Sequence, residues 1–90
     1  MPRYLIQRTF PGGLAILANE VAADAFRRVV ETNAELGVTW LHSYVTQDKE
    51  TSYCIYDGPD PTAIRRASAA NGLPVDSITR ITVLDPHFYH

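Results

Sequence analysis

The sequence contains a single cysteine, Cys54, so no disulfide can form within the chain. A lone thiol is typical of a reducing compartment, and we expect the protein in the cytoplasm. The N-terminal segment lacks the charged start, apolar stretch and cleavage site of a secretory signal. No apolar run approaches the roughly 20 residues that a membrane helix needs, so we expect no membrane partner.

Positive charge is also scarce. Lysine and arginine number 8 against 10 aspartates and glutamates, which gives a formal net charge of −2. This balance excludes the basic surface that nucleic-acid binding requires. Hydrophobic residues make up 46% of the 90-residue chain and charged residues 20%, which is typical of a folded globular domain. A chain this short buries a small share of its surface, so dimerisation would add useful burial.

Hydrophobic periodicity and chain breakers predict six elements. The expected elements are a strand at 3–10, a helix at 19–36 capped by Asn19, strands at 38–46 and 51–57, a helix at 60–71 and a strand at 77–84. This βαββαβ order predicts an α+β, ferredoxin-like fold, in which one antiparallel sheet carries both helices on one face. We expect a single domain over 1–86 and a C-terminal tail at 87–90.

The helix boundaries carry the clearest local signals. Asp60 can accept a hydrogen bond from an early helical N–H, and Pro61 suits the first helical position. Gly37 and Gly72 are natural left-handed stops after the two helices.

The sheet face without helices is expected to determine the function. If the hairpin register places His42 opposite Cys54, Ile55 joins the core and one aromatic set lies on the open face. That set consists of Trp40, His42, Tyr44, Cys54 and Tyr56, while Leu41 and Val45 join the core. A two-residue turn at Asp48–Lys49 would instead place His42 opposite Ile55, and Cys54 would then lie on the other face of the sheet.

The first strand offers less contrast between its two faces. Alternation places Arg8 on the same side as Tyr4 and Ile6, so neither side is uniformly apolar.

His42 and Cys54 offer an imidazole and a thiolate, which are good ligands for late first-row divalent metals. A large aromatic face is usually an interaction surface, so we expect a homodimer whose two-fold axis brings two copies of the ligands together. Spacing alone favours another interpretation, in which His42 forms a hydrogen bond in the dimer interface and Cys54 is a small buried hydrophobe.

An alternative function is a dimeric ferredoxin-like enzyme or small-ligand binder. It would use the cleft around His42, Tyr44 and Cys54, with His42 as general base or Cys54 as nucleophile. No oriented third residue is evident, so the sequence favours a binding protein over an enzyme.

Several short segments, in this order and spacing, carry a resemblance that covers nearly the whole chain. They are Trp40–Thr46, Asp48–Lys49, Tyr53–Tyr56, Gly58–Pro59, Gly72–Pro74 and Asp85–Pro86. The chain resembles a family of small bacterial nickel-binding proteins, long catalogued as a domain of unknown function. The resemblance implies a ferredoxin-like homodimer, forming a dimeric α/β barrel, that binds nickel or a similar divalent metal for sequestration or homeostasis.

The resemblance also bears on individual residues. His42 and Cys54 stand at the family's histidine and cysteine, and they are the metal ligands that we expect. A histidine that the resemblance implies in the second helix is replaced here by Ala67.

Overall fold

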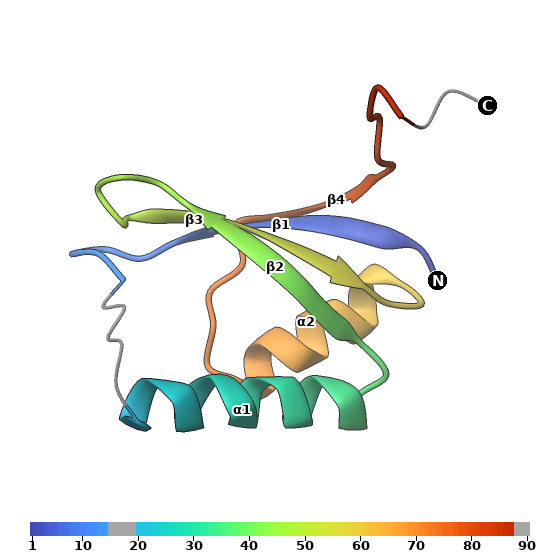
Figure 1. Cartoon of the computed structure of the whole chain (residues 1–90). Coiled ribbons are helices and arrows are strands. Elements are labelled where there is room, and N and C mark those ends of the chain that lie inside the picture. The colour runs from blue at the N-terminus through green and yellow to red at the C-terminus, as the bar shows by residue number, and fades with distance from the viewer. Residues whose placement is uncertain (15–19, 88–90) are drawn as a thin grey trace.

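The computed structural model of the chain describes residues 1–14 and 20–87. The elements are β1 (Arg3–Thr9), α1 (Glu20–Glu35), β2 (Thr39–Val45), β3 (Thr51–Asp57), α2 (Pro61–Ala70) and β4 (Ser77–Ile81). The four strands form one antiparallel sheet in the order β2-β3-β1-β4. Both helices lie on one side of this sheet, which confirms the predicted ferredoxin-like α+β fold (Figure 1). The predicted cap at Asn19 and residues 88–90 of the predicted tail lie outside the described residues.

The predicted helix boundaries have the expected chemistry. The Asp60 carboxylate accepts a hydrogen bond of 2.8 Å from the Ala63 N–H, and Pro61 begins α2. This contact satisfies an N–H that has no partner within the helix. Gly37 follows α1 with a φ of +76°, a left-handed conformation that costs glycine little.

The core lies between the sheet and the helices. Ile6 of β1 and Ile64 of α2 are both fully buried at its centre. The other buried members of this cluster are Tyr4, Val38, Cys54, Tyr56 and Ala67. Gly58 approaches the core closely, because a Cβ atom there would lie 3.1 Å from Cγ1 of Val38. The sheet and helix faces therefore share one apolar interior.

The β2–β3 hairpin turns through a polar loop. The Thr46 N–H donates to the Thr51 carbonyl at 2.9 Å, and the Glu50 N–H donates to the Asp48 carboxylate at 3.0 Å. Lys49 adopts a φ of +62° to complete the turn. This geometry gives the register of the alternative turn centred on Asp48–Lys49.

A β-bulge interrupts β2 between Trp40 and His42. Trp40 is paired with Tyr56, whereas His42 is paired with Ile55, so Leu41 is the extra residue. The bulge shifts the alternation of side chains by one position. Trp40 and His42 consequently lie on opposite faces of the sheet.

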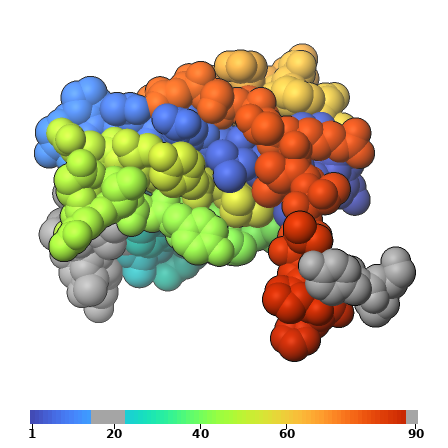
Figure 2. Space-filling model, turned by 90° about the horizontal axis from the view of Figure 1, so that it is seen from above, coloured from blue at the N-terminus to red at the C-terminus, as the bar shows by residue number. Residues whose placement is uncertain are grey.

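The open face of the sheet is turned toward the viewer in Figure 2. Residues 82–87, which follow β4, project from one edge of this face (Figures 1 and 2).

In the parts of the chain that the structure describes, neither helix has the length and apolar character needed to cross a membrane.

Candidate functional site

The two predicted metal ligands lie on opposite faces of the sheet. Cys54 is paired with Ile6 and Ser43, and it faces the helices with 7% of its surface exposed. His42 is paired with Ile55 and is exposed on the open face. Of the two registers that the sequence left open, the hairpin adopts the one that pairs His42 with Ile55, so His42 and Cys54 do not share a face.

The same register corrects the rest of the expected open face. Trp40 and Tyr56 belong to the helix side, where Trp40 packs at a ring distance of 5.9 Å from Phe26 of α1. Ile55 lies on the open side instead of in the helix-packed core, and Leu41 is exposed in the bulge. The predicted cleft around His42, Tyr44 and Cys54 is therefore not formed within one chain.

His42 has Tyr44 as its neighbour on the open face. Their rings meet edge to face, with centroids 5.2 Å apart. Tyr44 is 64% exposed, although it is a large aromatic residue. Where the structure describes side chains, no three histidine, cysteine, aspartate or glutamate residues come together as a metal site. Among the described residues, His42 is therefore not part of a ready-made group of metal ligands.

Cys54 lies instead beside a cavity on the helix side. Its Sγ is 3.5 Å from Oγ of Ser52, within the distance of a weak hydrogen bond. The cavity has a volume of about 260 Å³ and lies between α1, the sheet and the segment that follows β1. Cys54 thus lines this cavity on the helix side and is not exposed on the open face.

Arg8 is a residue of this cavity that the sequence did not single out as a candidate. It is the largest fully buried side chain, with 1% of its surface exposed. Its Nη1 donates to the Pro74 carbonyl at 2.7 Å and to Ser68 Oγ at 3.2 Å. The alternation of side chains along the first strand places Arg8 on the same face as Tyr4 and Ile6. That placement was the one sign in the sequence that Arg8 is buried.

The buried guanidinium of Arg8 influences the pKa of the neighbouring Tyr56. Arg8 lies over the Tyr56 ring, with its central carbon 5.7 Å from the ring centroid. Burial raises the pKa of the Tyr56 phenol, and the positive charge of Arg8 opposes this rise. The phenol is therefore a neutral group beside the cavity at neutral pH.

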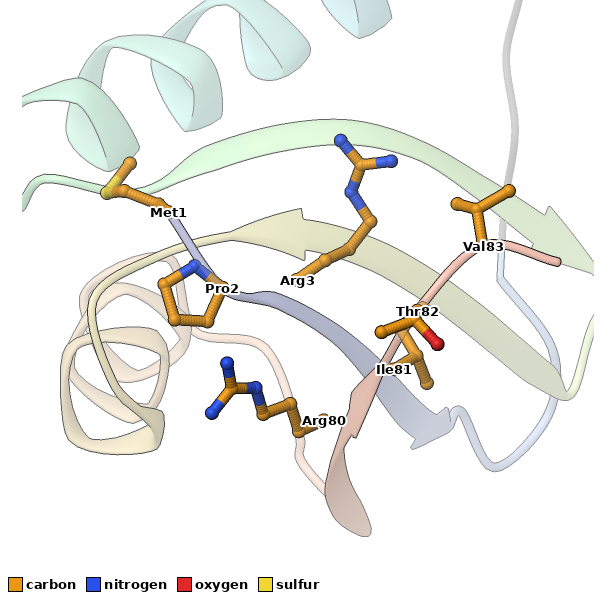
Figure 3. Close-up of a pocket in the computed structure, with 7 residues that line it drawn as sticks. All are labelled: Met1, Pro2, Arg3, Arg80, Ile81, Thr82 and Val83. Carbon is orange, nitrogen blue, oxygen red and sulfur yellow. The ribbon is translucent and has the colours of Figure 1, made fainter. Parts of the chain in front are cut away.

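A second hollow, of about 700 Å³, lies between the N-terminus and the end of β4. Arg3 and Arg80 both border it, but Figure 3 shows that their side chains point in different directions. Arg3 is bound to Asp57 through a 2.9 Å contact. The two cations therefore do not converge on a common ligand position.

The fold and the two faces of its sheet define a small ferredoxin-like α+β domain with an exposed imidazole on one face and a cavity under the other. The family model described as nickel responsive protein SCO4226-like matches residues 4–81. The chain belongs to this family, which confirms the resemblance drawn from the sequence. Nickel responsiveness, as the family is described, gives the protein a metal-related context.

The structure is also similar to a solved one. The crystal structure of SCO4226 from Streptomyces coelicolor A3(2) superposes with a TM-score of 0.71 at 17% sequence identity. The match covers 92% of this chain and 99% of that chain, and at this identity it supports the fold alone. No curated protein matches the chain by sequence.

Proposed function

We propose that the protein is a cytoplasmic homodimer that binds nickel, or a similar divalent metal, for sequestration or homeostasis. His42 supplies an imidazole ligand from the open face of each sheet. The observation that carries this proposal is the exposed His42 beside Tyr44 in a chain of a nickel-responsive family. Imidazole nitrogen is a good ligand for nickel.

A dimer is needed because one chain offers too few ligands on this face. Two-fold symmetry across the open face would bring two copies of His42 toward one another. Exposed apolar side chains support an interface here, since Tyr44 is 64% exposed and Leu84, in the projecting segment after β4, is 81% exposed. Face-to-face association of two sheets would give the dimeric α/β barrel predicted from the sequence.

Cys54 does not join His42 in this proposal. The sheet separates the two side chains, and the cavity beside Cys54 also contains the permanently charged Arg8. A cation at this position opposes the entry of a second cation. We therefore leave the Cys54 thiol out of the proposed metal site, and its own substitution tests this choice.

Calorimetric titration of the tag-free protein with nickel, zinc and cobalt tests the proposal. We expect the wild type to bind nickel with a Kd below about 100 μM, which corresponds to about −5.5 kcal/mol. His42→Ala should weaken binding at least about tenfold, because an imidazole ligand is lost. Absence of binding in this range contradicts the proposal.

Two further variants act as controls. His87→Ala removes another exposed imidazole, in the segment that projects after β4, and should leave the affinity unchanged. Cys54→Ala should also leave it unchanged. If Cys54→Ala weakens nickel binding as much as His42→Ala does, the metal site is not the one proposed.

A further inference from the structure

The cavity under the sheet has the composition of a small-molecule site. Apolar side chains reach it from α1, from β2 and from the segment after β1. They include Phe10, Leu14, Phe26, Val29, Trp40 and Val45. Its volume of about 260 Å³ is close to the lower end of the range for ligand pockets. The space suits a compound of about one aromatic ring or one branched aliphatic chain.

Arg8 provides a polar anchor in this apolar surrounding. Its guanidinium has five N–H donors and keeps its positive charge. Nη1 is occupied by Ser68 and Pro74, whereas Nε and Nη2 are buried without a hydrogen-bond partner. Among the side chains that the structure describes, no carboxylate lies within 4.0 Å of Arg8. A buried guanidinium with unpaired donors and no neighbouring carboxylate would be stabilised by a bound anion.

Neighbouring groups add further donors to the same surface. Ser52 and Tyr56 carry hydroxyl groups, and both line the cavity together with Arg8. The Trp40 indole N–H is already used, because it donates to Ser43 Oγ at 2.8 Å. The polar groups of the cavity are therefore gathered around Arg8, while the remaining walls are apolar.

We propose that this cavity binds a small carboxylic acid with an apolar body, whose carboxylate pairs with the Arg8 guanidinium. A planar carboxylate matches the fork of donors on an arginine side chain. The aromatic and aliphatic walls take up the body of the acid and remove it from water. A compact inorganic anion would leave those walls without contacts. The site lies across the sheet from His42 and goes beyond the proposed metal binding.

Trp40 allows a direct binding measurement, because it is the sole tryptophan and lines the cavity. The full chain is titrated with phenylacetate, and with phenylacetamide as a neutral compound of the same shape. We expect phenylacetate to change the Trp40 emission saturably, with a Kd below about 10 mM. Phenylacetamide should bind at least about tenfold more weakly, because it lacks the charge that Arg8 recognises.

Matched variants test the role of the guanidinium. Arg8→Met should weaken phenylacetate binding at least about tenfold, while Arg28→Met, at an exposed position of α1, should leave it unchanged. Val45→Phe keeps Arg8 and narrows the cavity, so it should also weaken binding. Circular dichroism shows whether each variant is folded. If Arg8→Met does not fold, the binding measurement on Val45→Phe tests the proposal instead.

The proposal is overturned if phenylacetate gives no saturable change up to about 10 mM in the folded wild type. Equal affinities for phenylacetate and phenylacetamide would overturn it as well. So would an undiminished affinity in a folded Arg8→Met variant. None of these results depends on nickel, so they leave the metal proposal to its own experiment.

Discussion

Trp40 and His42 lie only two positions apart in β2, yet they face opposite sides of the sheet because of the bulge at Leu41. Trp40 packs against Phe26 on the helix side, and His42 meets solvent beside Tyr44. This relationship separates the two candidate sites of the protein. The open face carries the imidazole, and the helix side carries the cavity with Cys54 and Arg8.

The two faces differ in the reactivity that they give a thiol. Cys54 is buried, so Ellman's reagent should modify it at least about 100-fold more slowly in the native protein than in guanidinium chloride. A cysteine placed by His42→Cys in a background that carries Cys54→Ala and the dimer-breaking Tyr44→Glu should react rapidly, because position 42 is exposed in the single chain. If the Cys54 thiol and the introduced thiol react at comparable rates in their folded proteins, the assignment of faces is contradicted.

Tyr44 tests the proposed dimer. Tyr44→Glu places a charge on the open face at a side chain that is 64% exposed, so it should convert the dimer to monomers. Sedimentation velocity measures the change. Thr62→Glu, on the exposed surface of α2, is the control and should remain dimeric. A wild type that sediments as a monomer, or a Tyr44→Glu variant that remains dimeric, is the result against this interface.

Ile64 tests the core that joins α2 to the sheet. Ile64→Ala removes a fully buried side chain and should lower the free energy of unfolding by about 2–5 kcal/mol. Thr62→Ala, at an exposed position of the same helix, should change it by less than about 0.5 kcal/mol. Urea denaturation measures both values. A loss below about 1 kcal/mol for Ile64→Ala would argue against the packing described.

The Arg3–Asp57 pair predicts a pH dependence. Arg3 donates from Nε to Oδ1 of Asp57 at 2.9 Å and from Nη2 to Oδ2 at 3.3 Å. These bonds lower the pKa of the Asp57 carboxyl from its ordinary value. A lowered folded-state pKa means that the pair's stabilisation is present above the ordinary pKa and is lost as the pH falls through the folded value.

Asp57→Asn should therefore be less stable than the wild type at pH 7, and the difference should close below about pH 4. Urea denaturation at a series of pH values measures the two curves. The Arg3→Met variant should follow the same pattern, since it removes the other partner. A difference that stays constant down to about pH 3 would show that the pair is not its source.

The order of elements and most of their boundaries could be predicted because their causes are local, although β4 ends at Ile81 and not at the predicted residue 84. Asp60 caps α2 through its carboxylate, and Gly37, which has no side chain, follows α1 in a left-handed conformation. The choice between the two hairpin registers could not be made in the same way. A bulge at Leu41 depends on packing across strands, and alternation along one strand does not reveal it.

The candidate site was predictable only in part. The resemblance led to the nickel-responsive family, and His42 is exposed on the open face, where the proposed site lies. Arg8 was visible as a charged residue in an otherwise apolar set, but its burial arises from contacts with Ser68 and Pro74, which lie more than 50 positions away in the sequence. Sequence patterns of a single strand do not contain such contacts.

X-ray absorption at the nickel edge of the loaded protein tests the central claim most directly. The account predicts nitrogen and oxygen neighbours around nickel, with an imidazole contribution that is lost in His42→Ala and retained in His87→Ala. It predicts no sulfur neighbour from Cys54, which faces the helices. A sulfur neighbour that disappears in Cys54→Ala, together with an imidazole contribution that survives in His42→Ala, would contradict it.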